Sequence, residues 1–334
     1  MTEGALDIVV IEGGPSSEAA VSRSSAEGVA RALEAAGHRV TRLALGASVA
    51  RALESTRSDV VFPVVHGTFG EDGCLQGLLE LMGLSYVGSG VLASALASDK
   101  IAAKVVFRAQ GLPVAEECVV VRGEDLALAA LRVRRGLGPA VVVKPHAQGS
   151  AIGVTRVPGA ASQDDLARAL ERALSLDERA LCERFVEGRE VTCGVLDSPS
   201  FGETRSLPPT EIVAKAADFY DFRSRYGTGG SEHICPAQLG ADVVATVQRV
   251  ALAAHRALGC RDLSRADFVV GDGDDPDRVT LLEINTIPGM TPTSLYPEAA
   301  RVAGISMDRL CDGFVRGAHA RGARKWNDPV PLPE

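Results

Sequence analysis

The chain has 334 residues, 46% of them hydrophobic, and a net charge of −8. This length and composition predict a soluble globular protein with a substantial core and two or three domains. Charged residues form no long run of one sign, which argues against a general nucleic-acid surface, and no apolar stretch is long enough to span a membrane. The seven scattered cysteines and the absence of a signal-peptide pattern indicate reduced thiols and a cytoplasmic protein.

The first hundred residues alternate strand-like and helix-like segments. Helices are expected at about 19–36 and after Cys74, and strands at 7–11, 38–45, 59–65 and 85–87. Short connections between such segments favour a mostly parallel sheet. Ligands of parallel sheets gather at the carboxyl ends of the strands, so the loops at that edge are candidate binding loops.

Two polar loops follow strands of this predicted sheet. The first ends at Glu18, which we expect in the first turn of the next helix, where it would either stabilise the helix dipole or bind a substrate. The second runs from His66 to Gly73 and carries Glu71, and its three glycines allow a close approach of the backbone to a ligand. The first loop lacks the G-x-G-x-x-G pattern, which weakens a dehydrogenase interpretation.

The middle of the chain repeats the α/β pattern. Helices are expected at about 91–110, 124–134 and 163–174, and strands at 112–121, 139–143, 154–157 and within 180–192. Lys144 ends a strand and precedes the small-residue loop 146–153, an arrangement that suits a nucleotide polyphosphate although it is not a Walker A motif. A lysine that extends from the sheet edge into solvent is the alternative for Lys144.

A long polar segment with glycines and aromatic residues follows at 216–235. It contains Arg225 and Tyr226. A long irregular segment inside a compact domain is more often a functional lid than a connection without a function, so we interpret it as a lid over a site.

Two apolar, β-rich runs at 265–270 and 279–285 are separated by a turn of glycines and aspartates, which predicts a hairpin. Side chains alternate along a strand, so Arg265 shares a face with Asp267, and Glu283 shares a face with Asn285. If the two faces align, three oxygen ligands lie beside an arginine, as Mg²⁺ bound to a triphosphate requires. A solvated face is the ordinary interpretation of a lone carboxylate, but four polar groups at matched spacing favour a site.

Five ordered motifs in this chain resemble those of the D-alanine–D-alanine ligases of the ATP-grasp superfamily. The motifs are Gly13-Gly14-x-Ser16-x-Glu18, His66-Gly67-x-x-Gly70-Glu71, Lys144-Pro145 with Gly149-Ser150, Arg265-x-Asp267, and Glu283-x-Asn285 with Pro288-Gly289. The resemblance implies an α/β, three-domain ATP-grasp architecture with a parallel-sheet N-terminal domain. The expected domains are 1–98, 99–185 and 186–334, with ATP between the second and the third.

The resemblance also implies which residues hold the nucleotide and its metal ions. Lys100 and Lys144 would bind phosphates, and Arg225 would contact the nucleotide from the lid. The residues expected at the adenosine are Glu183 at the adenine end, the backbone of Phe185 and Val186 at the adenine, and Glu190 at the ribose. Two Mg²⁺ or Mn²⁺ ions would be held by Asp267, Glu283 and Asn285.

A second group of residues would hold the two amino acids. Glu18 would bind the ammonium of the first D-alanine, at an end of the site that His66 and Glu71 also line. Ser294 and the Leu295 amide would bind the carboxylate of the second D-alanine. Residues with a catalytic role would be Arg265 and the Gly289 N–H at the oxyanion, and Ser150 with Tyr226 at the lid and the nucleophile.

The implied reaction joins two D-alanines through an acyl phosphate, with release of ADP and phosphate, for peptidoglycan precursor synthesis. Two residues depart from the family pattern, since Ala151 replaces a second serine and Arg225 replaces a lysine. The alternatives are D-lactate or D-serine as the acceptor, and a silent nucleotide-binding regulator. Relatives of this architecture are often dimers, so a homodimer is also expected, without nucleic-acid or membrane partners.

Overall fold

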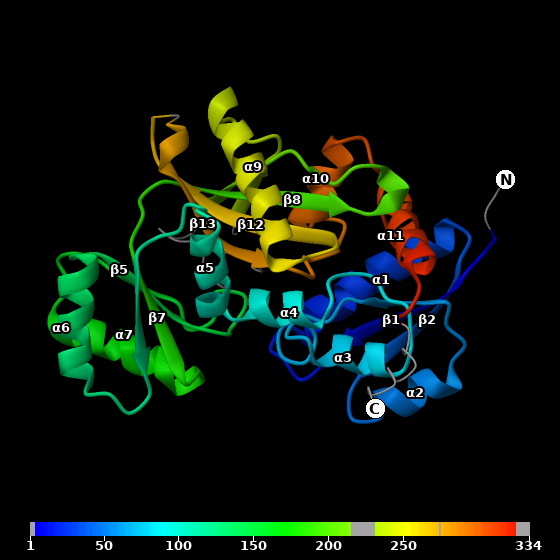
Figure 1. Ribbon diagram of the computed structural model, residues 1–334, viewed down its shortest axis with the longest axis horizontal. Helices are drawn as coiled ribbons and strands as arrows, with labels where there is room; N and C mark the ends of the chain where they lie inside the picture. The colour runs from blue at the N-terminus through cyan, green and yellow to red at the C-terminus, as the bar shows by residue number, and fades with distance from the viewer. Residues whose placement is uncertain (1–3, 215–230, 274, 325–334) are drawn as a thin grey trace, which may run out of the picture.

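The computed structural model describes residues 4–214, 231–273 and 275–324. Its elements form three sheets, each with its own helices (Figure 1). The first sheet is parallel, in the order β2-β1-β3, as predicted. Its strands are β1 (Asp7–Gly13), β2 (Arg39–Leu45) and β3 (Val60–Pro63), and the helices of this region are α1 (Ala19–Ala35), α2 (Val49–Ser55), α3 (Cys74–Leu81) and α4 (Val91–Ser98). Residues 85–87 form an isolated bridge, Tyr86 to Val61, rather than the expected strand.

The second sheet is antiparallel, in the order β4-β7-β5-β6. Its elements are β4 (Glu117–Val121), β5 (Val141–Pro145), β6 (Thr155–Val157), β7 (Arg179–Arg184), α6 (Leu126–Leu137) and α7 (Gln163–Leu176). Both helices pack on the sheet through apolar side chains at helical spacing, including Val133, Leu166 and Leu170. The loop between β5 and β6 is the small-residue loop 146–153, which leaves this sheet toward the other two.

The third sheet has six strands, in the order β11-β10-β8-β12-β13 with β9 paired to β8. Its strands are β8 (Arg189–Asp197), β9 (Arg205–Ser206), β10 (Thr210–Ala214), β11 (Ser231–Ile234), β12 (Asp262–Val270) and β13 (Val279–Asn285). The remaining elements of this region are α5 (Lys100–Ala109), α9 (Ala241–Leu258), α10 (Leu295–Val302), α11 (Met307–Arg321) and two short 3-10 turns, Pro199–Phe201 and Pro276–Arg278.

Helices cover the third sheet and connect it to the first. α5 and α9 share one buried cluster with β8, β12 and β13, and α11 packs beside α1 in a second cluster that also includes β1 and β3 (Figure 1). The first and third sheets are therefore joined by continuous apolar packing. In the described part of the chain, no helix is long and apolar enough to cross a membrane. The domain boundaries at 98/99 and 185/186 stay a prediction.

The predicted helix over 91–110 is broken at Asp99, where the backbone is extended between α4 and α5. The Asp99 carboxylate accepts hydrogen bonds of 3.0 Å from the N–H groups of Ile101 and Ala102, so it caps the new helix. Helix-forming residues on both sides concealed this break in the sequence. Its consequence is that Lys100 becomes the first residue of α5, beside the loop 146–153.

A buried ion pair joins the three segments that meet between the first and third sheets. Asp262, at the start of β12, has a fully buried side chain and accepts two hydrogen bonds of 2.7 and 2.8 Å from Arg321 of α11. It also accepts a 2.7 Å hydrogen bond from the Gly88 N–H, while Arg321 donates to the Tyr86 carbonyl. These hydrogen bonds fix the start of β12 relative to the first sheet.

We expect Asp262→Asn to lower the free energy of unfolding by about 3 kcal/mol, because it leaves the Arg321 guanidinium without its buried counter-charge. Asparagine keeps the size of the side chain and tolerates the positive φ of 63° at this position. The matched control is Arg324→Ala, which breaks the exposed pair with Glu80 and should cost only about 0–1 kcal/mol. An equal loss of unfolding free energy in the two variants, measured by urea unfolding, would contradict the prediction.

Candidate active site

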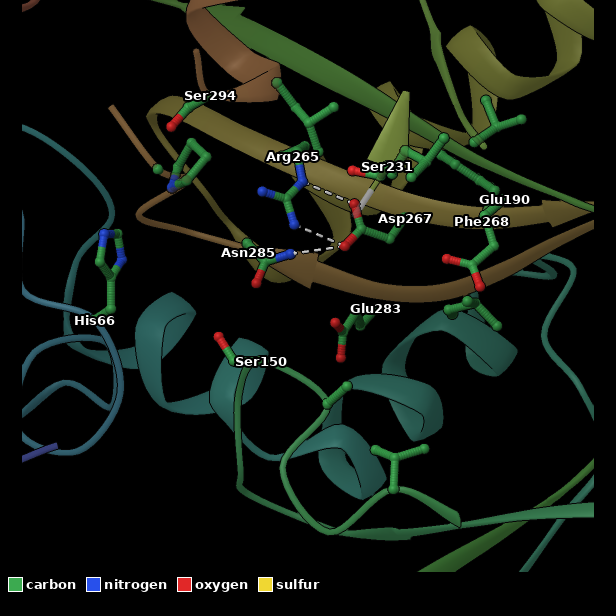
Figure 2. Close-up of a pocket in the computed structure, with 18 of the residues that line it drawn as sticks. His66, Ser150, Glu190, Ser231, Arg265, Asp267, Phe268, Glu283, Asn285 and Ser294 are labelled. Carbon is green, nitrogen blue, oxygen red and sulfur yellow. Dashed lines mark hydrogen bonds and ion pairs between the residues drawn. The ribbon is translucent and has the colours of Figure 1, made fainter. Parts of the chain in front are cut away.

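A cavity of about 890 Å³ lies where the three sheets meet. Its walls come from the loops after β1 and β3, the loop 146–153, the β7–β8 connection, one face of the third sheet and the start of α10 (Figure 2). The predicted site residues that line it are Glu18, His66, Glu71, Lys100, Lys144, Ser150, Glu183, Phe185, Val186, Glu190, Arg265, Asp267, Glu283, Asn285, Gly289, Ser294 and Leu295. Arg225 and Tyr226 lie outside the described residues.

The hairpin of β12 and β13 forms one wall of the cavity. In its antiparallel register Arg265 pairs with Asn285 and Asp267 pairs with Glu283, so the predicted alignment of the two polar faces is confirmed. The Asp267 carboxylate accepts two hydrogen bonds of 2.8 Å from Arg265 and one of 3.2 Å from Asn285 (Figure 2). A further hydrogen bond of 2.7 Å comes from Thr192 of β8, a contact that the sequence analysis missed because it depends on the pairing of β8 with β12.

The oxygen donors of this wall suit a hard divalent cation. Asp267 and Glu283 offer carboxylates, and Asn285 offers an amide oxygen, all from one face of the hairpin. Among the described residues, no three His, Cys, Asp or Glu side chains are grouped to hold a metal ion. Two carboxylates and an amide match the donor chemistry of Mg²⁺, which commonly takes its remaining ligands from phosphate oxygens and water. Lys100 lies 3.2 Å from Glu283 and balances its charge.

Two lysines and two carboxylates cluster at the floor of the cavity, where Lys144 and Glu183 line it and Lys104 lies 3.5 Å from Glu117. Glu183 of β7 contacts both Lys104 and Lys144, and its side chain is 4% exposed. Burial alone would raise the pKa of Glu183, but the positive charges of Lys144 and Lys104 outweigh it and lower the pKa to about 2. The sequence analysis assigned no role to Lys104. Its i, i+4 spacing from Lys100, on the helix face that also carries the buried Phe107, is the signal that could have found it.

The loop 146–153 closes on the first region. Ser150 donates a hydrogen bond to Glu18, and a Cβ at Gly149 would lie 3.0 Å from a Glu18 carboxylate oxygen. Lys100 donates a hydrogen bond of 2.8 Å to the Gln148 carbonyl, which fixes the loop on α5. Close approach of the loop to a carboxylate thus explains why a glycine stands at position 149.

Glu18 precedes α1 rather than standing in its first turn, which corrects the sequence expectation. Its carboxylate makes no capping hydrogen bond to the helix, and its side chain is buried in the cavity wall. The neighbouring Ser16 hydroxyl donates to the His66 carbonyl and accepts a 3.3 Å hydrogen bond from the Glu18 N–H. The carboxylate therefore lies in the cavity wall at the start of α1, and its role toward a ligand stays a prediction.

His66 brings an imidazole to the same end of the cavity. Its Nδ1 lies 3.6 Å from a Glu71 carboxylate oxygen, and the residue is buried. Burial opposes the charged imidazole, but Glu71 and the nearby Glu18 outweigh this effect and raise the pKa of His66. Within the described ranges, His66 Nε2 has no hydrogen-bond partner. A buried donor of this kind is suited to an anionic group of a ligand.

The N-terminus of α10 forms a further part of the cavity wall (Figure 2). Ser294 is its N-cap residue, and the Ser294 hydroxyl contacts the Thr291 N–H at 3.1 Å and the Thr291 hydroxyl at 2.7 Å. A Cβ at Gly289 would lie 2.9 Å from this hydroxyl, so a side chain there would displace the Ser294 hydroxyl from this position. Backbone N–H groups at a helix N-terminus favour a bound anion, so Ser294 and Leu295 are well placed for a carboxylate.

Tyr296 holds α10 on the sheet. Its hydroxyl donates a 2.8 Å hydrogen bond to the Val195 carbonyl, and its ring covers Gly194 of β8. A Cβ at Gly194 would lie 3.0 Å from that ring. The helix can sit this close to the sheet because position 194 has no side chain.

The connection between β7 and β8 lines the remaining wall. Phe185 is held there by a 3.0 Å hydrogen bond from its N–H to the Ala140 carbonyl, and the Arg156 guanidinium lies 4.0 Å from the centre of its ring. Glu190 follows on β8, on the face of the sheet that lines the cavity (Figure 2). An aromatic residue, apolar neighbours and a carboxylate are together suited to a nucleoside.

Two family models match this chain, and both describe the same family. The model described as "D-ala D-ala ligase C-terminus" matches residues 106–316, and the model described as "D-ala D-ala ligase N-terminus" matches residues 46–89. The chain belongs to the D-alanine–D-alanine ligase family. This membership bears out the resemblance drawn from the five motifs.

Relatives of this ligase family match nearly the whole chain. A D-alanine--D-alanine ligase of Parvibaculum lavamentivorans is 46% identical over 93% of this chain and 97% of its own length, and one of Halalkalibacterium halodurans is 45% identical over 93% and 98%. Among solved structures, a D-alanine--D-alanine ligase from Bacillus anthracis complexed with ATP has a TM-score of 0.79 and 29% identity, with coverage of 95% of this chain and 98% of that one. The three-domain α/β architecture is that of the ligase family.

In this ligase, Glu183 should make stability depend on pH in a defined window. A carboxyl group whose folded pKa is lowered contributes stability above its unfolded pKa and loses it as the pH falls through the folded pKa. The shift of Glu183 from 4.5 to about 2 corresponds to about 3 kcal/mol. We therefore expect Glu183→Gln to be much less stable than the wild type at neutral pH, with a difference that shrinks between about pH 4.5 and about pH 2.

Urea unfolding at several pH values measures this difference. Glu116→Gln is the matched control, because Glu116 lies near the same sheet in an exposed pair with Arg184, where the side chain of Glu116 is 67% exposed. It should change stability by about 0–1 kcal/mol at every pH. A stability gap between Glu183→Gln and the wild type that does not change with pH would contradict the buried-charge assignment.

Proposed function

We propose that the protein catalyses the ATP-dependent ligation of two D-alanines to D-alanyl-D-alanine through an acyl phosphate, with release of ADP and phosphate, for peptidoglycan precursor synthesis. The observation that carries the proposal is that one cavity contains an oxygen-donor hairpin, two lysines, a buried Glu18 and a helix N-terminus. Relatives that bear the name D-alanine--D-alanine ligase cover 93% of the chain at 45–46% identity, which supports the same reaction.

The nucleotide would lie between the second and third sheets. Phe185, Val186 and Glu190 line the wall suited to adenosine, and Lys100 and Lys144 line the wall between it and Glu18. Both lysines are held in place by carboxylates, so they would meet a polyphosphate already oriented. Bound Mg²⁺ would neutralise charge that builds on the phosphates as the γ-phosphoryl group moves. Asp267, Glu283 and Asn285 are the residues that would hold it.

The first D-alanine would bind near Glu18. Glu18 would pair with its ammonium group, and Ser150 is hydrogen-bonded to Glu18 and therefore lies at the same position. The buried His66 Nε2 would donate a hydrogen bond to the carboxylate, whose oxygen attacks the γ-phosphorus. When both groups are held in one orientation, the carboxylate and the γ-phosphate react as neighbours in one complex. This lowers the entropic part of the activation barrier, which is a large contribution in an enzyme that forms no covalent intermediate.

The second D-alanine would bind at the N-terminus of α10. Ser294 and the Leu295 N–H would hold its carboxylate, and its deprotonated amine would attack the acyl phosphate. Arg265 and the Gly289 N–H would stabilise the oxyanion of the tetrahedral intermediate. The two hydrogen bonds from Arg265 to Asp267 fix the plane of the guanidinium before the reaction, so little reorganisation is needed.

Two finer parts of the proposal concern location and assembly. We propose a cytoplasmic enzyme, because the reaction consumes ATP. We also propose a homodimer. Leu81 of α3 and Leu92 of α4 are 68% and 70% exposed on helices that pack together, and they offer apolar surface for a second copy.

The proposal is tested by ADP release from purified protein with ATP and Mg²⁺. We expect release with D-alanine, and little with L-alanine. D-Alanine supplied with D-serine or with D-lactate tests the two alternative acceptors, and analysis of the product identifies the one that is used. ATP binding without ADP release under any of these conditions would favour a silent nucleotide-binding protein and refute the ligase.

We predict that Glu283→Gln lowers kcat by about 100-fold or more, because the loss of a metal-binding carboxylate removes several kcal/mol of charge stabilisation. Asp272→Asn, in the turn of the same hairpin, removes the same charge far from the cavity and is the matched control. Thermal unfolding should be nearly unchanged in Asp272→Asn, and it should remain cooperative in Glu283→Gln, which also loses its pair with Lys100. Near-normal turnover in Glu283→Gln would refute its assignment as a metal ligand.

A further inference from the structure

His233 lines the cavity, although the sequence analysis gave it no role. It lies on β11, where its register partner on β10 is Ile212, and Ile212 is in turn paired with Glu190 of β8. Residues that pair directly across antiparallel strands share one face, so His233 and Glu190 lie two strands apart on the same face of the sheet. The cavity therefore extends past the predicted nucleoside wall to an imidazole.

The imidazole is held by a carboxylate of α10. His233 Nδ1 lies 3.0 Å from a Glu298 carboxylate oxygen, and His233 Nε2 lies 3.5 Å from the Ser231 hydroxyl. The side chains of His233 and Glu298 are 23% and 22% exposed, so the pair is largely shielded from solvent. Arg301 is 3.9 Å from the other Glu298 oxygen, but its side chain is 74% exposed and makes a weaker contact.

Glu298 lies one turn into the helix whose N-terminus faces the cavity. Its N–H donates a 3.0 Å hydrogen bond to the carbonyl of Ser294, the N-cap residue. Under the proposed function, this N-terminus binds the carboxylate of the acceptor. A second carboxylate one helical turn away would repel that group, because partly buried charges are poorly screened. The contact with His233 directs the Glu298 carboxylate toward β11, where the imidazole can donate a hydrogen bond to it.

We propose that His233 is a positioning residue for the acceptor amino acid. By holding Glu298, it keeps a like charge away from the acceptor carboxylate and fixes α10 against β11. This inference rests on the proposed function, since it concerns the acceptor end of the same site. The inference predicts that loss of His233 changes the KM of the acceptor more than the KM of ATP or of the first D-alanine.

The test is a rescue experiment with His233→Phe, Glu298→Gln and the double variant. ADP release against D-alanine concentration yields separate KM values for the donor and the acceptor. We expect His233→Phe to raise the acceptor KM about tenfold, with kcat, the ATP KM and the donor KM within about twofold of the wild type. Adding Glu298→Gln should return the acceptor KM to within about threefold of the wild type, because it removes the repulsive charge.

His233→Ala, alone and with Glu298→Gln, repeats the test with a small side chain that makes no hydrogen bond to Glu298, and it carries the test if the phenylalanine variant does not fold. Glu232→Gln is the matched control on β11, because its side chain points to the opposite face, and it should leave all KM values unchanged. No rescue in either double variant, or equal changes in the donor and acceptor KM, would overturn the inference and leave the ligase activity standing. Wild-type protein that releases no ADP would overturn both proposals.

Discussion

Strand register in the third sheet is the constraint on which the rest of the cavity depends. β12 pairs along its length with β8 on one side and with β13 on the other. A shift of one residue would turn Arg265 and Asp267 to the opposite face and remove both from the cavity. In the observed register the Asp267 carboxylate accepts hydrogen bonds from β8, β12 and β13. The same strand pairing therefore determines both the positions of the oxygen donors and the orientation of the Arg265 guanidinium.

Charges around this hairpin are compensated within the protein. Glu183 lies between Lys104 and Lys144, and Lys100 contacts both Glu283 and the loop 146–153. An unpaired charge in such a place would cost several kcal/mol, whereas a paired one costs far less. The cavity can therefore hold lysines ready for a polyphosphate without a large loss of stability. The same pairs hold α5, the second sheet and the third sheet in one arrangement.

Local patterns in the sequence predicted the parts of this architecture that depend on local spacing. The hairpin of β12 and β13 follows from alternation along two short runs, and the parallel first sheet follows from short α/β connections. Contacts between distant segments were not predictable in this way. Thr192 meets Asp267 across 75 positions of sequence, and His233 meets Glu298 across 65. The break at Asp99 was also missed, because a strong capping residue can stand inside a continuous run of helix formers.

Gly194 controls a binding site that it does not touch. Tyr296 covers this glycine, and its ring sets the height of α10 above the sheet. A Cβ at position 194 would crowd Leu207 and the Tyr296 ring, at the base of the helix whose first residues, Ser294 and Leu295, line the cavity. In a search for variants with altered acceptor preference, substitutions at this position would reshape the pocket without changing a single polar group in it. Selection on substrate range can therefore act through backbone spacing in the sheet, at a position with no polar side chain of its own.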